Sequence, residues 1–353
     1  MRKIQGYIVK NKDIFVGLED SKKSWKLCLR SEVMIIAQVS MPAKYDNFIN
    51  YLRKGFPQCR IKLIYEAGFS GFWLHDLLVS DGIECIVTPP HTVTVEKVSK
   101  VKTDKRDAIR LAKNLENGDY KSCYVPDRER REDRQINRTL TQVQKNIKRE
   151  KNRIRGLLKF HGLERGLSER KWTNKDYLNL ENLNLGDSLK DSLSSLLRML
   201  KVFLEEEQKL KKALLDLIKK ERYSRSVEIK KSCPGIGRLT AIRLTLEWGD
   251  MNRFRNGKSI SSFTGLTSSE YSTGETTRKG RITSQGSRSV RGWLIQCSWA
   301  SIKKDPALLT KFQNVYNNSG SRKKAIVAIA RKLSVRIRAI ELKDQPYEIG
   351  VIE

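Results

Sequence analysis

Histidine and paired cysteine are almost missing from this 353-residue chain. It has three histidines, and its six cysteines are scattered singly, with no Cys-x-x-Cys pair. This scarcity argues against a zinc site and against a disulfide framework. It favours reduced thiols and a cytoplasmic location, with the cysteines acting as packing residues.

Long apolar runs are missing too. The longest, Val33–Val39, is interrupted by Gln38 and has the length of a β-strand. A membrane-spanning helix needs about 18 consecutive apolar residues, and the N-terminal residues MRKIQ lack the apolar stretch of a signal peptide. The sequence therefore predicts neither a membrane span nor a secretion signal.

Acidic residues are too few to balance the basic ones. There are 40 Asp and Glu against 70 Lys and Arg, so the formal charge is +30 and the pI is near 9.9. Such an excess favours a nucleic-acid partner, because each neutralised phosphate releases counterions. An anionic membrane surface is the alternative, which the lack of apolar runs disfavours. The composition thus predicts a protein that binds nucleic acid.

Residues 1–125 are predicted to form an α/β domain. Short β-rich segments joined by polar turns predict an antiparallel meander, and helices alternating with strands follow it. A last helix is expected to begin after an N-cap at Thr103 or Asp104. The other expected elements are strands 14–18, 25–29, 33–39, 61–66 and 84–87 and helices 45–54 and 71–79. This order is that of ribonuclease H-like, or RuvC-like, domains.

Acidic residues fall at informative places in this order. Glu19 and Asp20 end the first strand, Glu66 ends the fourth, and Asp104 and Asp107 lie on the first turn of the last helix. Carboxylates at the ends of adjacent strands and on a facing helix turn can converge on the divalent cations of phosphoryl transfer, and Mg²⁺ prefers such ligands. A capped, salt-bridged helix start is the simpler explanation of the two aspartates alone. Together the acids predict a metal site.

Residues 126–227 are predicted to form long helices in a coiled coil. Apolar residues recur at heptad spacing over 136–157 and 189–217, with a polar loop at 164–187 between them. Such a seam needs a partner, either the other helix in an antiparallel hairpin or the same helix of a second subunit. Residues 128–165 hold 13 basic and 5 acidic side chains, which favours contact with a nucleic-acid backbone over a merely solvated face.

Residues 228–353 are predicted to form a mainly helical domain. It opens with Pro-Gly-Ile-Gly at 234–237, which is typical of the turn of a helix-hairpin-helix. Gly235 and Gly237 would let backbone N–H groups approach a phosphate at the start of the next helix. An ordinary turn between two helices is the alternative.

A segment rich in Ser, Thr and Gly follows at 268–275. After it, residues 276–297 contain five Lys or Arg and no acidic residue. A serine hydroxyl in this setting could be placed against a phosphodiester, with the basic side chains neutralising charge that develops on the phosphorus. An ordinary loop is the simpler alternative from these residues alone.

Basic side chains in all three regions, with the two glycines, are predicted to contact nucleic acid. Those beside the two aspartates suit a polyanion on which the metal would act. The predicted contact residues are Lys102, Lys105, Arg106, Lys148, Arg149, Arg153, Gly235, Gly237, Arg278, Lys279, Arg281 and Arg288.

Both ends of the chain resemble one family. The sequences VGLEDSKKSW at 16–25, YEAG at 65–68 and KTDKRDA at 102–108 are similar to the RuvC-like domain of the DEDD transposases of bacterial insertion-sequence family 110, with features of subgroup 1111. Residues 234–300 resemble the transposase domain of the same family. The acidic motif and the serine motif, occurring in this order in one chain, indicate this family more specifically than either motif alone.

The resemblance also implies which residues are functional. Glu66, Asp104 and Asp107 match the last three of four acidic metal ligands, and the first position, usually Asp, is Glu19 here with Asp20 next to it. Strand register favours Glu19, because successive side chains point to opposite faces, and Asp20 remains the alternative. The family's nucleophilic serine lies in a motif matched by YSTG, so the resemblance assigns it to Ser272.

The resemblance thus implies a Mg²⁺-assisted DNA recombinase of an insertion element, in which Ser272 forms a transient phosphoserine link. It further implies a structured guide RNA that pairs with donor and target DNA, a homo-oligomer, dimer or tetramer, and a bacterial cytoplasmic location on the nucleoid. Two other classes stay open. One is a metal-dependent junction nuclease without a serine intermediate, and the other is a non-catalytic nucleic-acid-binding protein whose acids are structural.

Overall fold

The computed structural model describes residues 11–68, 70–90, 103–163, 172–271, 276, 278–283 and 285–350. They belong to two compact units, with the boundary between Val125 and Pro126, and each unit has its own hydrophobic core. Among the described helices, none is both long and apolar enough to cross a bilayer.

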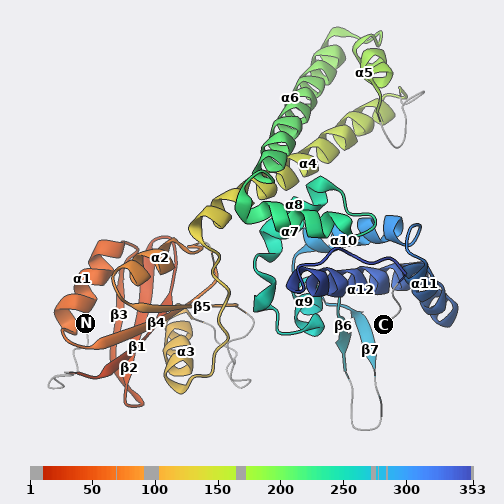
Figure 1. Cartoon of the computed structure of the whole chain (residues 1–353). Helices are drawn as coiled ribbons and strands as arrows, with labels where there is room; N and C mark the ends of the chain where they lie inside the picture. Colours follow the sequence, from red (N-terminus) through yellow and green to blue (C-terminus); the bar gives the residue numbers. More distant parts are fainter. Residues whose placement is uncertain are drawn as a thin grey trace. The chain divides into compact units, whose positions relative to one another are not determined.

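The N-terminal unit is built on a mixed five-stranded sheet with the strand order β3-β2-β1-β4-β5 (Figure 1). The first three strands form the predicted antiparallel meander, and β4 and β5 extend it in parallel from β1. The strands are β1 (Asp13–Glu19), β2 (Ser24–Ser31), β3 (Met34–Pro42), β4 (Arg60–Glu66) and β5 (Glu84–Thr88). The predicted order of elements is confirmed, and it is consistent with a ribonuclease H-like fold.

In the described part of this unit, three helices cover the sheet: α1 (Tyr45–Gly55), α2 (Trp73–Ser80) and α3 (Asp104–Asn117). On one face, Val16 and Leu18 of β1 pack with α1 and α2. On the other, Ile64 of β4 packs with Leu111 of α3. Because strand side chains alternate, every second residue of β1 and β4 is turned toward α3.

Gly17 brings α3 against the sheet. A Cβ atom at Gly17 would lie 2.2 Å from the carbonyl oxygen of Ala108 and 2.4 Å from the backbone nitrogen of Ala112. No side chain fits between β1 and the helix here. The close approach places the first turn of α3 beside the ends of the central strands.

The C-terminal unit begins with a helical hairpin of α4 (Arg128–Phe160) and α6 (Asp187–Leu217). Leu140 of α4 belongs to the same cluster as Leu214 of α6, whereas Ile154 packs with Leu193 and Leu200. The helices are therefore antiparallel, and each fills the other's heptad seam. Of the two partners predicted for this seam, the structure shows the other helix of the same chain in an antiparallel hairpin.

The prediction of a loop over 164–187 was wrong for part of that range. Helix α5 (Asn174–Glu181) lies there, and a capping box between Thr173 and Asp176 starts it. Trp172 and Leu180 are buried at the tip of the hairpin. The sequence contains this capping signal, but the polar composition around it obscured the short helix.

Among the remaining helices, α12 packs against α7, α9, α10 and α11, and its buried residues belong to the same hydrophobic core as those of α8. β6 (Ser268–Glu270) and β7 (Lys279–Ile282) form a small antiparallel hairpin. In the sequence this hairpin lies between α9 and α10. The helices are α7 (Glu221–Ser232), α8 (Arg238–Trp248), the 3-10 turn η1 (Met251–Arg253), α9 (Gly257–Phe263), α10 (Arg288–Ser301), α11 (Pro306–Ser319) and α12 (Arg322–Leu342).

Candidate metal centre and serine segment

Glu19 and Glu66 lie side by side at the ends of adjacent strands. β1 and β4 are parallel, and Leu18 pairs with Tyr65, so the two glutamates come next in the same register. Glu19 is two residues beyond Gly17, and Glu66 is two residues beyond Ile64, both of which contact or pack with α3. By strand alternation both glutamates are on the α3 face of the sheet.

The first turn of α3 supplies two more carboxylates. Thr103 is the N-cap, and its side chain accepts a hydrogen bond from the backbone N–H of Arg106 at 3.4 Å. This cap fixes Asp104 and Asp107 one helical turn apart. Asp104 is exposed and Asp107 is 5% exposed, so the pair extends from the surface into the region where the strands end.

The acidic side chains repel one another. The pKa of Glu19 is raised to about 7, first by burial and then by the negative charges of Glu66, Asp107, Asp20 and Asp104. A raised pKa means that the ionised carboxylate is disfavoured in this place. Added positive charge would relieve that repulsion.

Arg110 supplies part of this positive charge and was not predicted from the sequence. Its Nη2 atom is 3.0 Å from Asp107 Oδ1 and 3.3 Å from Glu66 Oε1, so one guanidinium bridges helix and strand. The spacing of Asp107 and Arg110, three residues apart on a helix, was the available signal. With side chains in these positions, no three acidic, His or Cys residues of the described chain are grouped closely enough to hold a metal ion.

The donor set nevertheless suits a divalent cation. The acidic side chains of this region offer carboxylate oxygens, the donors that Mg²⁺ prefers. One oxygen of Asp20, Oδ2, is buried without a hydrogen-bond partner in the described structure. A cation that took the place of the Arg110 guanidinium would meet Glu66 and Asp107 directly, with Glu19 and Asp104 as neighbours. These residues therefore fit the metal that the carboxylate pattern predicts.

Asp20 differs from Glu19 in its surroundings. It follows the last residue of β1, and it is among the charges that, after burial, raise the pKa of Tyr65. Tyr65 packs in the cluster on the α1 and α2 face of the sheet. The charge of Asp20 thus acts on Tyr65 as well as on Glu19, whereas strand register places Glu19 on the face of α3.

The predicted turn at 234–237 joins α7 to α8. Gly235 has a φ of +85°, and a Cβ atom there would lie 2.6 Å from the carbonyl oxygen of Cys297 in α10. This glycine is therefore required for packing within the unit. Gly237 is the N-cap of α8 and has open space around its α-carbon, so it is the glycine of this turn that a phosphate could approach.

The serine segment, defined as residues 272–275 of the stretch rich in Ser, Thr and Gly, lies between β6 and β7 in the sequence. The backbone N–H of Tyr271 donates to the carbonyl oxygen of Arg278 at 2.8 Å. The described residues before and after the segment are therefore hydrogen-bonded to each other. Ser272 itself lies outside the described residues, as do Lys102 and the side chain of Lys279. The structure places the ends of this segment and leaves the assignment of Ser272 as a prediction.

The other predicted contact side chains are at the surface. Arg153 donates to Glu150 at 2.8 Å, and Glu150 is 1% exposed within the hairpin seam. The exposed predicted residues are Lys105, Arg106, Lys148, Arg149, Arg153, Arg278, Arg281 and Arg288.

The mixed sheet and its carboxylates indicate a class of enzyme. A ribonuclease H-like domain with acids where a helix crosses the ends of two central strands is typical of enzymes that transfer phosphoryl groups of nucleic acids. Comparison with known families narrows this class. A transposase model for the DEDD domain of IS110 elements matches residues 21–162, and a model described as transposase IS116/IS110/IS902 family matches residues 228–313. The chain belongs to the IS110 family of transposases, which are DNA phosphoryl-transfer enzymes.

Individual relatives agree with this assignment. The transposase for insertion sequence element IS1533 of Leptospira borgpetersenii is 28% identical, over 71% of this chain and 74% of its own length. Two Sinorhizobium fredii proteins named as candidate transposases, y4qE and y4rJ, are 28% and 27% identical over 67% and 92% of this chain. The chain spans 57% of the length of y4qE and 90% of y4rJ.

The close approach at Gly17 leads to a prediction about stability. We expect Gly17→Ala to lower the free energy of unfolding by about 1–3 kcal/mol, because the new methyl group overlaps the α3 backbone. Gly55→Ala is the matched control, since a Cβ atom there meets nothing within 4 Å. Thermal or denaturant unfolding measures both variants. Equal stability of Gly17→Ala and wild type would contradict the close contact between β1 and α3.

Proposed function

We propose that the chain is a DNA recombinase of an insertion element that cuts and rejoins DNA through Ser272, assisted by Mg²⁺. The observation that carries this proposal is that β1, β4 and the first turn of α3 each present carboxylates on the same face of the sheet. Their mutual repulsion, seen in the raised pKa of Glu19, favours a cationic ligand in this place. The matches to the IS110 family at both ends of the chain support the same activity.

Glu19, Glu66, Asp104 and Asp107 are the proposed ligands of the cation. Glu19 is preferred to Asp20, because strand register turns Glu19 toward the α3 carboxylates. When bound, Mg²⁺ supplies a Lewis acid that lowers the pKa of a coordinated hydroxyl and neutralises charge on the phosphate. A cation held by Glu66 and Asp107 would take the place of the Arg110 guanidinium that now pairs with them.

Ser272 is the proposed nucleophile. Its Oγ attacks the phosphorus of a DNA phosphodiester, an Oγ–P bond forms, and the P–O bond to one deoxyribose breaks. The serine proton leaves to a nearby base, and the departing deoxyribose oxygen takes up a proton. A hydroxyl of the partner DNA strand then attacks the phosphoserine and releases the enzyme. Arg278 and Arg281, which follow the segment in the sequence, would neutralise charge on the phosphate.

We also propose that a structured RNA guides the chain to its donor and target DNA. Base pairing would then carry the sequence specificity, while the protein recognises shape and backbone. The charge of +30 and the exposed cations of α4 are suited to such a partner. The active form is proposed to be a homo-oligomer. Since the seam of α4 and α6 is filled within one chain, subunits would have to contact through other surfaces.

Nucleic acid that copurifies with the full-length protein tests the guide. Extraction and sequencing are expected to yield one discrete structured RNA, because a guide binds specifically whereas general basic attraction does not select. Ser272→Ala protein is the control and should yield the same RNA, since the hydroxyl is assigned to chemistry. A mixture of host RNA and DNA in proportion to abundance would contradict the guide while leaving the recombinase to be tested separately.

A further inference from the structure

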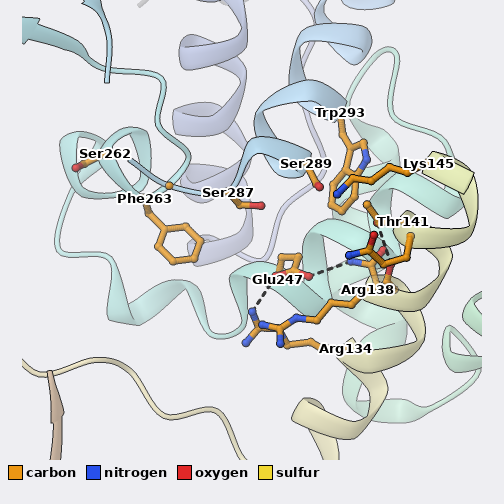
Figure 2. Close-up of a pocket in the computed structure, with 13 residues that line it drawn as sticks. Arg134, Arg138, Thr141, Lys145, Glu247, Ser262, Phe263, Ser287, Ser289 and Trp293 are labelled. Carbon is orange, nitrogen blue, oxygen red and sulfur yellow. Dashed lines mark hydrogen bonds and ion pairs between the residues drawn. The ribbon is translucent and has the colours of Figure 1, made fainter. Parts of the chain in front are cut away.

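The C-terminal unit contains a pocket of about 570 Å³ at the base of the helical hairpin (Figure 2). One wall is α4, which contributes Arg134, Arg138 and Lys145. The opposite wall is the N-terminal end of α10, with Ser287 and Ser289. All of its lining residues belong to the C-terminal unit.

The cations of the pocket are only partly neutralised. Glu247 is the one carboxylate among the residues that line it. Its two oxygens accept from Arg134 at 2.8 Å and from Asn137 at 3.0 Å. Arg138 and Lys145 are exposed, and among the described residues neither has an ion-pair partner. Two free positive charges therefore face one pocket.

A further cation, Arg243, lies directly beneath the pocket. Arg243 is 6% exposed, and it donates to Asn137 Oδ1 at 2.8 Å and to Thr141 Oγ1 at 3.0 Å. Its guanidinium stacks on Trp293, 4.0 Å from the ring centroid. These three partners are neutral, and all of them line the pocket. Arg243 thus adds a buried positive charge behind the lining that is hydrogen-bonded to neutral side chains and feels the charge of Glu247.

The start of α10 adds donors on the other side. Ser287 is the N-cap, and its side chain accepts from the backbone N–H of Val290 at 3.4 Å. The first N–H groups of a helix have no carbonyl partner within the helix, and the helix dipole attracts an anion to this end. Cations and helix N-terminus therefore face each other across the pocket, as in a phosphate site.

The pocket is also the root of the β6–β7 hairpin. Phe263, before β6, and Gly286, after β7, both line it. The two ends are in close contact, since a Cβ atom at Gly286 would lie 2.4 Å from the carbonyl oxygen of Phe263 and 2.7 Å from the nitrogen of Gly265. A ligand in the pocket thus touches the base of the hairpin that carries the serine segment.

The cations continue along α4 beyond the pocket. Arg138, Lys145 and Arg149 are exposed and are spaced by seven and four residues, so they follow one face of the helix. At 1.5 Å per residue this stripe spans about 16 Å. A small anion would need only the pocket, whereas a linear polyanion can use the pocket and the stripe together.

We propose that this pocket binds a phosphate of a nucleic-acid strand and holds the strand at the base of the β6–β7 hairpin. The inference rests on the proposed function only in taking nucleic acid as the source of the phosphate. DNA and the guide RNA both offer this group, so the chemistry is shared and the source is decided by experiment.

The test compares two double variants of the full-length protein in EDTA, where cleavage is prevented. Arg138→Ala with Lys145→Ala removes the free cations of the pocket. Arg198→Ala with Lys201→Ala removes two exposed cations from α6 in the same hairpin and is the matched control. Fluorescence anisotropy measures the affinity for DNA and RNA strands of one sequence over a range of salt, and thermal unfolding checks the fold.

We expect the pocket variant to bind at least one of the two strands about tenfold or more weakly, and its salt slope to fall by about 1 to 2. The control should stay within twofold of wild type. Whether the affinity falls for the DNA strand, for the RNA strand or for both identifies which nucleic acid supplies the phosphate. Equal weakening in the two double variants would overturn the proposal in favour of diffuse surface attraction, and unchanged affinity of the pocket variant would overturn it as well.

Ser289→Glu gives an independent measurement, because it places a carboxylate in the pocket without removing a cation. It should weaken binding at least as much as the double variant, and normal binding would contradict the site. Ser272→Ala separates this proposal from the recombinase. That variant is expected to bind normally, so failure of the serine chemistry would leave the result at the pocket intact.

Discussion

Ser272→Ala is expected to abolish strand exchange, with a loss of at least about a thousandfold, and to leave nucleic-acid affinity within twofold of wild type. A nucleophile makes its essential contribution in the bond-forming step, so its loss reduces the rate and not the binding. Recombination between two plasmids carrying donor and target sites measures the rate, and anisotropy measures the binding.

The same residue should be the point of covalent attachment. With wild-type protein, DNA and Mg²⁺, we expect a protein–DNA adduct that maps by mass spectrometry to the peptide containing Ser272. Thr273→Ala is the neighbouring control and should still form the adduct. An adduct at another residue, or cleavage that persists in Ser272→Ala, would show that the chain acts as a metal-dependent nuclease without a serine intermediate.

Glu66→Gln, Asp104→Asn and Asp107→Asn should each abolish recombination while the fold stays intact. An amide keeps the shape of the side chain but loses the charge that holds Mg²⁺. Glu84→Gln is the matched control, because Glu84 is an exposed acid on the neighbouring strand, where it forms a solvent-accessible ion pair with Lys62 at 3.4 Å. The rise in unfolding temperature on adding Mg²⁺ or Mn²⁺ reports binding without reference to activity.

Glu19 and Asp20 should behave unequally in this series. Glu19→Gln is expected to abolish the metal-dependent rise in unfolding temperature, whereas Asp20→Asn should retain most of it. In metal-free protein at pH 8, Glu19→Gln should unfold at a higher temperature than wild type, since it removes a carboxylate that burial and its neighbours disfavour. Full activity of Asp104→Asn combined with Asp107→Asn would refute the metal site.

Several features of this protein were predictable from the sequence because they depend on local order. Strand alternation, helix periodicity and turn residues act over a few positions, so the meander, the first turn of α3 at Thr103 and the two long helices could be located in advance. The ends of strands and the start of a helix also locate Glu19, Glu66, Asp104 and Asp107. Composition, which needs no structure, predicted nucleic acid as the partner.

Only the tertiary structure decided which groups meet. Heptad spacing is the same for a partner within the chain or in a second subunit, and packing of Leu140 with Leu214 selects the first. Arg110 contacts Glu66 across 44 residues of sequence, and Arg243 lies under a pocket whose walls come from distant helices. Such contacts depend on long-range packing, because local periodicity determines where a side chain points along its own element and not what it meets there.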